Sequence, residues 1–171
     1  MNYNALLKIA PGEHRNPDAV ENVVRYICRY DKKEPLPLYC YGASPSPDTT
    51  AACDNIIQAF HDSQKVHKNL PEREVWHLIL SFPSSFEPGE LNPFRFADDI
   101  ARLFSLEYPS CYSYHSDTDN PHFHLAVSTS GCTPDVPPLD LPEMNSYIDR
   151  IMQLAAAYRI TLTLKGEMKD V

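Results

Sequence analysis

Long apolar runs are absent from this sequence. No segment approaches the roughly 20 apolar residues that a membrane span needs, and the N-terminus, beginning Met1-Asn2-Tyr3, lacks the basic and apolar regions of a signal peptide. These absences argue against membrane insertion and favour a cytoplasmic protein. At 171 residues, the chain is expected to form one compact domain over residues 1–171, with a substantial hydrophobic core.

Closely spaced cysteine pairs and positive charge are also scarce. The five cysteines include no CxxC pair and are odd in number, which suits reduced thiols in a reducing compartment. The 23 acidic and 15 basic residues give a net charge of −8. This balance argues against broad, sequence-independent binding to nucleic acid, because such binding depends on phosphate neutralisation. A nucleic-acid role therefore needs a local basic patch or a partner protein.

One such patch is present, although a solvated helix end is the simpler interpretation. It surrounds the end of the first predicted helix and continues further along the chain: Arg25, Arg29, Lys32, Lys33, Lys65 and Lys68.

The spacing of apolar residues and turn formers predicts the secondary structure. Strands are expected at 4–10, 74–82, 111–115, 122–128 and 160–164, and helices at 16–31, 50–66, 92–106 and 142–158. Residues 35–50 are rich in proline and are expected to be irregular. This order suits an α+β fold, in which helices cover one face of a central antiparallel sheet and the other face is open for a site.

The strongest chemical signal is a group of three histidines, His115, His122 and His124, spaced at intervals of seven and two. Side chains alternate along a strand, so His122 and His124 point to one side while Phe123 points to the core. The intervening Ser-Asp-Thr-Asp-Asn-Pro consists of turn formers, which would bring His115 back beside the pair. Three neutral imidazoles with an open coordination position suit a catalytic divalent metal.

A fourth histidine, His77, is expected on the same sheet face. Its strand alternates, and the opposite, core-facing set comprises Trp76, Leu78, Leu80 and Phe82. His77 could be an ordinary hydrogen-bonded strand histidine, or it could support the metal ligands or contact substrate.

The run His-Ser-Asp-Thr-Asp-Asn-Pro-His-Phe-His-Leu-Ala-Val, from His115 to Val127, resembles the metal motif of the relaxase and mobilisation nuclease family. These are HUH endonucleases, which start plasmid transfer. The segment His-Leu-Ile-Leu-Ser-Phe-Pro, from His77 to Pro83, is similar to the family's strand just before that motif. The N-terminal strand and helix also carry tyrosines where the family keeps its nucleophile. The resemblance covers the chain from about residue 5 to residue 165.

The resemblance implies a strand-specific nick in single-stranded DNA at a transfer origin, with a covalent 5′-phosphotyrosine and later resealing. It also implies an accessory DNA-binding protein as partner. A divalent cation would neutralise the non-bridging phosphate oxygens and the charge that builds in the transition state. Phosphoryl chemistry suggests Mn²⁺ or Mg²⁺, whereas three imidazoles bind Zn²⁺, Ni²⁺ or Co²⁺ more tightly.

Two tyrosines one helical turn apart, Tyr26 and Tyr30, are candidates for the nucleophile. At roughly 100° per residue, Tyr30 lies nearer the apolar face of the predicted helix and Tyr26 lies farther round. Tyr26 is therefore favoured as the catalytic residue, although both tyrosines could simply flank the core.

Three charged residues are expected in supporting roles. Asp117 could orient His115 or His122, or cap the turn. Arg25 and Arg29 flank Tyr26 and could hold the DNA backbone.

Three other functions stay open. A replication initiator of the same endonuclease class would use the same metal and tyrosine at a replication origin. A degenerate relaxase-like protein would bind DNA or a partner without catalysis. A closed structural zinc site would need a fourth ligand, for which Cys132 and His77 are the nearest candidates.

Overall fold

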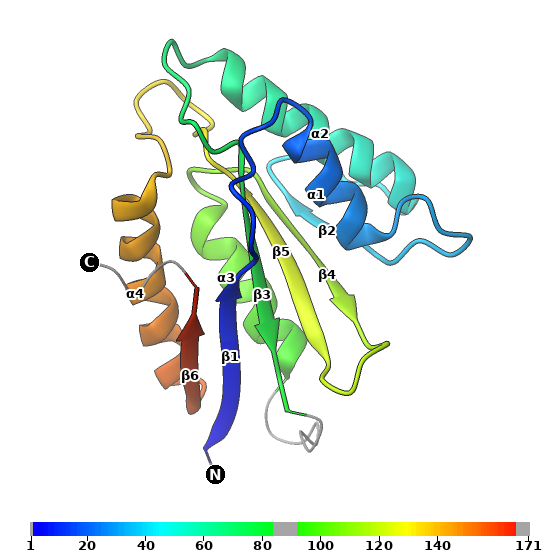
Figure 1. Ribbon diagram of the computed structural model, residues 1–171, viewed down its shortest axis with the longest axis vertical. Coiled ribbons are helices and arrows are strands. Elements are labelled where there is room, and N and C mark those ends of the chain that lie inside the picture. The colour runs from blue at the N-terminus through cyan, green and yellow to red at the C-terminus, as the bar shows by residue number, and fades with distance from the viewer. Residues whose placement is uncertain (1, 84–91, 167–171) are drawn as a thin grey trace.

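The computed structural model describes residues 2–83 and 92–166. Its strands are β1 (Tyr3–Ile9), β2 (Tyr39–Tyr41), β3 (Val75–Ser81), β4 (Ser110–His115), β5 (His122–Ser128) and β6 (Ile160–Lys165). Its helices are α1 (Ala19–Cys28), α2 (Thr49–Lys65), α3 (Pro93–Phe104) and α4 (Leu141–Ala157). The strands form one six-stranded sheet in the order β2-β4-β5-β3-β1-β6 (Figure 1).

The sheet is antiparallel except at one edge, where β6 runs parallel to β1. The predicted α+β class with a largely antiparallel sheet is confirmed. The sequence prediction missed β2, a strand of three residues within the proline-rich stretch. In the part of the chain that the structure describes, no helix combines the length and apolar character needed to cross a bilayer.

The main core lies between the sheet and helices α3 and α4. The predicted core-facing residues of β3 are all buried in it, as are the alternate residues of β5, Phe123, Leu125 and Val127. Helix α3 starts at an N-cap, Asn92, whose side chain accepts a hydrogen bond from the Arg95 N–H, and it contributes Phe96, Ile100 and Phe104 to this core. Alternation along the strands and the longer repeat of the helix therefore direct apolar side chains into the same buried layer.

A second core lies on the other face of the sheet, so helices pack on both faces and not on one face as expected. Helices α1 and α2 cover one end of that face (Figure 1). They pack on Val75 of β3, Cys111 of β4 and Ala126 of β5, all of which are buried. These side chains are small and let the helices approach the sheet. This face stays open toward the hairpin end, where His122 and His124 lie, and along β1 and β6, where Lys8, Thr161 and Thr163 are exposed.

Strand register explains why the histidines meet. In the β4–β5 hairpin, His115 pairs with His122 and Ser113 pairs with His124. In the β3–β5 pair, His124 pairs with Ile79, two residues from His77. Since side chains two residues apart share a face, His77 and His124 lie diagonally on adjacent strands. The turn formers at 116–121 close the hairpin, as the sequence predicts.

We expect Leu78→Ala to destabilise the fold by about 2–5 kcal/mol, because Leu78 is fully buried in the central strand and the truncation leaves a cavity. Urea unfolding followed by circular dichroism measures this change. Leu106→Ala is the matched control, because Leu106 is 87% exposed and should change stability by less than about 0.5 kcal/mol. Equal effects of the two substitutions would contradict the assignment of this core.

A polar contact joins α1 to α2 and predicts a pH dependence. Nε2 of His61 lies 2.7 Å from Oε1 of Glu21, and Nδ1 lies 3.2 Å from Oε1 of Gln64. Burial alone would lower the pKa of His61, but the hydrogen bonds that the ring donates to Glu21 and Gln64, and the charges of Glu21 and Glu74, outweigh it, and the pKa is raised. A raised pKa stabilises the fold below the unfolded value of 6.5, and this contribution is lost as pH rises through the folded pKa.

The stability difference between the wild type and His61→Gln should therefore be larger at pH 5.5 than at pH 8.5. Chemical unfolding at the two pH values measures it, and subtracting the variant removes the contribution of the other histidines. A difference that grows with pH would have the wrong sign for this contact.

Candidate metal centre

The three motif histidines converge at the hairpin end of the sheet. One nitrogen each from His115, His122 and His124 can be chosen so that all three lie within 4.8 Å of one another. The ring centroids of His115 and His124 are 4.4 Å apart, and those of His122 and His124 are 4.9 Å apart. This three-histidine cluster could hold a metal ion.

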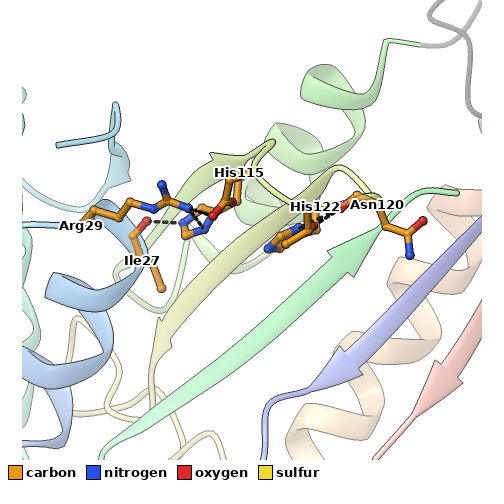
Figure 2. Close-up of polar contacts among 7 residues, drawn as sticks. Ile27, Arg29, His115, Asn120 and His122 are labelled. Atoms are coloured by element: carbon orange, nitrogen blue, oxygen red, sulfur yellow. Dashed lines mark hydrogen bonds and ion pairs between the residues drawn. The ribbon is translucent and has the colours of Figure 1, made fainter. Parts of the chain in front are cut away.

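Hydrogen bonds select which nitrogen of two rings is free. Nε2 of His115 lies 2.8 Å from the carbonyl oxygen of Ile27, so this nitrogen carries the proton and donates it (Figure 2). Nδ1 of His122 lies 3.0 Å from the carbonyl oxygen of Asn120 and likewise donates (Figure 2). The lone pairs that could face a metal are therefore those of His122 Nε2 and His115 Nδ1, and the second of these accepts a hydrogen bond from Arg29 Nη2 at 3.5 Å that a bound metal would replace.

The third ring is held by another imidazole. Nδ1 of His124 lies 2.8 Å from Nε2 of His77. The Nε2 atom of His124 is buried and has no hydrogen-bond partner among the residues that the structure describes. Buried polar atoms without a partner are rare and need an explanation. A metal ion on this nitrogen supplies one, with His77 accepting the Nδ1 proton and fixing the tautomer, as partners of metal-bound histidines do.

The electrostatics keep these rings neutral. Burial, followed by the charges of His77, His115 and His122, lowers the pKa of His124 to about 2. Burial also lowers the pKa of His77 to about 4, with smaller contributions from His14 and His115. Burial is again the main reason that the pKa of His115 is lowered. Unprotonated imidazoles are the form that binds a metal, so His115 and His124 are ready to bind near neutral pH.

The last turn of α1 docks on this cluster. The helix ends in a Schellman pattern, in which the Tyr30 N–H donates to the Arg25 carbonyl at 2.9 Å and the Arg29 N–H donates to the Tyr26 carbonyl at 3.2 Å. The carbonyl of Ile27, which the helix leaves without an internal partner, accepts the proton of His115 instead.

Arg29 occupies the left-handed position of this pattern, with φ of 54°, where glycine is usual. Its side chain gives a reason for the strain. Nη2 of Arg29 lies 2.6 Å from Oδ2 of Asp117 in the hairpin turn, and 3.5 Å from Nδ1 of His115. The hydrogen bond from Arg29 is the main reason that the pKa of Asp117 is lowered, so the carboxylate is ionised and balances the guanidinium.

The two candidate tyrosines have different surroundings. Tyr26 is 60% exposed, and its ring centroid lies 5.4 Å from that of His124, 6.0 Å from that of His77 and 6.4 Å from that of His115. The Tyr30 hydroxyl instead donates to Oδ2 of Asp54 on α2, at 3.4 Å. Arg25 lies over the Tyr30 ring, 5.0 Å from its centroid. Tyr26 and Arg29 therefore border the histidine cluster, whereas Tyr30 and Arg25 contact each other and α2.

A fourth protein ligand is missing from the cluster within residues 2–83 and 92–166, where the metal-competent group consists of the three histidines. His77 uses Nε2 in its bond to His124, and Cys132 lies outside the group. Three ligands leave a coordination position open, which is typical of a catalytic site and not of a closed structural one.

A groove of about 580 Å³ adjoins the cluster. His77, His124 and Tyr26 form one part of its wall, and His14, on the loop after β1, forms another. The sequence analysis gave no role to His14, because only the folded loop brings it near His77, with ring centroids 6.2 Å apart.

Comparison with known proteins identifies the family. The family model described as "Relaxase: MobA/VirD2-like, nuclease domain" matches residues 26–133, which include Tyr26 and all three histidines. The chain belongs to this relaxase family. The resemblance seen in the sequence is thereby confirmed, and a relaxase nuclease domain with such a histidine triad is the domain of a DNA endonuclease.

A solved structure supports the fold. The relaxase chain is similar to the one reported under "Molecular Basis of Vancomycin Resistance Transfer in Staphylococcus aureus", with a TM-score of 0.54 and 10% identity. The match covers 98% of this chain and 99% of that chain. At this identity the likeness shows the fold alone. No curated protein matches the chain.

We expect His124→Ala to abolish tight binding of Mn²⁺ or Co²⁺, because it removes the buried nitrogen that has no other partner. His77→Ala should weaken binding by about 10- to 100-fold, because it removes the group that orients His124. Titration calorimetry measures both.

His67→Ala is the control, because Nε2 of His67 lies 3.0 Å from the carbonyl oxygen of Gly131, outside the three-histidine cluster. Unchanged metal affinity in His124→Ala would contradict the metal assignment.

Proposed function

We propose that this relaxase nicks one DNA strand at a transfer origin, with Tyr26 as the nucleophile and His115, His122 and His124 as metal ligands. The observation that carries the proposal is the placement of Tyr26, an exposed tyrosine whose ring lies 5.4 Å from that of His124. A single-stranded segment at the hairpin end of the sheet would place its scissile phosphate between the tyrosine and the open coordination position. Residues 1–171 would act as one nuclease domain.

A bound divalent cation would supply charge neutralisation at the non-bridging oxygens of that phosphate. Tyr26 would attack phosphorus through its hydroxyl oxygen as the phenolic proton leaves, and the bond to the 3′ oxygen would break. The product would be a 5′-phosphotyrosine and a free 3′ hydroxyl. Because one phosphodiester replaces another, the 3′ hydroxyl can reverse the reaction and reseal the strand.

Arg29 would hold the DNA backbone at the edge of the site. Its guanidinium is permanently charged and matches phosphate geometry, and it lies 3.5 Å from Nδ1 of His115. Asp117 offsets that charge, which would otherwise disfavour a cation on the same nitrogen. Asp117 therefore has a supporting role through Arg29.

Tyr30 is the weaker candidate for the nucleophile. The negative charge of Asp54 raises the pKa of Tyr30, which disfavours the phenolate. Its hydroxyl points to α2, where it donates to Asp54. Arg25 covers its ring and is similarly removed from the histidines.

The net charge of the chain bears on its partners, and the histidine ligands bear on the choice of metal. With a net charge of −8, the relaxase is expected to rely on an accessory DNA-binding protein and on local contacts with single-stranded DNA. The proposed cofactor is Mn²⁺ or Mg²⁺. The proposed location of the protein is the cytoplasm. A replication initiator of the same class would use the same residues on a different origin, and a degenerate relaxase would bind DNA without cleaving it.

We expect Tyr26→Phe to eliminate covalent attachment to DNA, because it removes the attacking oxygen and leaves the ring. The substrate is an end-labelled pool of single-stranded DNA with a randomised central segment, incubated with Mn²⁺ and run on a denaturing gel. The wild type should give a labelled protein band.

Tyr30→Phe is the matched control, since it removes the same atom one helical turn away and should keep most of the band. A band retained in Tyr26→Phe and lost in Tyr30→Phe would exchange their roles. No band with the wild type, with or without candidate accessory proteins, would favour the degenerate alternative.

A further inference from the structure

The groove beside the histidine cluster has an unusual lining for a DNA enzyme. Among the described residues that line it, none is Lys or Arg. Besides Tyr26, His77 and His124, its polar side chains are the imidazole of His14, the amides of Asn16 and Asn22, and the carboxylate of Glu13. Its apolar part includes Ala10 and Ile79. The part of the groove away from Tyr26 and His124 has no cationic side chain and one carboxylate, which disfavours a phosphate there.

Two arginines of neighbouring segments are held by other groups. Arg15 forms ion pairs with Glu13 at 3.7 Å and with Glu72 at 3.1 Å. Arg73 donates from Nη1 to the Gly12 carbonyl at 3.3 Å and lies over the Trp76 ring, 4.1 Å from its centroid. These contacts occupy both guanidinium groups, and the groove is lined by neutral donors and acceptors and the carboxylate of Glu13.

His14 is constrained in a way that the fold alone does not explain. Its φ of 46° lies in the left-handed region, which is costly for a residue with a Cβ. Its carbonyl accepts a hydrogen bond from the Glu74 N–H at 2.8 Å, which anchors the backbone. Its ring packs on Gly12, where an added Cβ would lie 3.3 Å from the ring carbon Cε1. The backbone of His14 is therefore anchored, and its ring lies against Gly12.

The Nε2 atom of His14 is nevertheless buried without a hydrogen-bond partner. Burial, with a smaller contribution from Arg73, lowers the pKa of His14. The neutral ring offers one donor and one acceptor. A neutral imidazole with an anchored backbone and an unpartnered Nε2 is suited to a ligand that presents hydrogen-bonding groups on a flat, uncharged edge.

We propose that this groove is a base-recognition pocket, which takes one unpaired nucleobase next to the scissile phosphate and reads its edge with His14 and Asn22. The inference rests on the proposed function, because it assumes that the DNA strand passes Tyr26. The volume of about 580 Å³ accommodates a base with its sugar. Amide side chains offer a donor and an acceptor together, which match base edges, and single-stranded bases are available for such contacts.

The test is a binding selection from a single-stranded DNA pool with a randomised segment, in the presence of Mn²⁺. All bound DNA is sequenced, and the covalently attached fraction is separated on a denaturing gel and aligned at its 5′ end. The proteins are the wild type, His14→Ala, Asn22→Ala and, as a control, Asn55→Ala. Asn55 lies outside the groove, and its amide donates to the Ser44 carbonyl at 3.0 Å.

We expect the wild type and Asn55→Ala to prefer one base at one position by roughly tenfold or more. In His14→Ala and Asn22→Ala, this preference should fall to about twofold, while preferences at other positions stay unchanged. Asn22 is exposed on α1, so its variant keeps the test open if His14→Ala does not fold, which circular dichroism detects.

Two results would overturn the pocket: base preferences that are unchanged in both variants, or a uniform loss of binding with no change of preference. A covalent adduct without the predicted shift would leave the proposed function standing and remove the pocket. A change of base preference in the bound DNA without any covalent adduct would support the pocket and contradict the proposed nicking. A wild type that binds no DNA from the pool would contradict both.

Discussion

One hydrogen bond connects the parts of this molecule that the chemistry needs together. It runs from Nε2 of His115, at the end of β4, to the carbonyl of Ile27, in the last turn of α1. It occupies a carbonyl that the helix end leaves open, and it leaves Nδ1 of His115 as the nitrogen for a metal. It also holds the helix end against the hairpin, so the neighbouring Tyr26 stands beside the histidine rings.

The same arrangement concentrates groups that are costly without a ligand. Imidazoles from three adjacent strands are packed together with pKa values lowered by burial, one buried nitrogen lacks a partner, and Arg29 is held in a left-handed conformation. Strain and unsatisfied polar atoms of this kind are retained where a site requires them. A metal ion would satisfy the buried nitrogen of His124, so metal binding should also stabilise the folded state.

Much of the three-histidine cluster could be predicted from the sequence, because its determinants are local. Strand alternation placed His122 and His124 on one face, and the turn formers at 116–121 returned the chain to His115. Alternation also identified the core face of β3, including Trp76 and Leu78. A periodic pattern over six or seven residues shows which side chains share a face of the strand, and it needs no knowledge of other segments.

The features that the sequence did not predict depend on contacts between distant segments. Strand β2 has three residues and exists through pairing with β4. The second helical layer depends on small side chains such as Cys111 and Ala126, which form no distinctive pattern. The contact between His77 and His124 depends on the register of β3 against β5, and the position of His14 depends on the loop after β1. Such contacts between distant segments cannot be read from a single sequence.

The most direct test of the central claim is anomalous diffraction from crystals of the protein soaked in Mn²⁺. One strong peak is expected in contact with Nδ1 of His115, Nε2 of His122 and Nε2 of His124, with the bond from His115 to the Ile27 carbonyl intact and Tyr26 facing the ion. A crystal without a peak at this cluster, or a peak bound through Nε2 of His115 with α1 displaced, would contradict the claim.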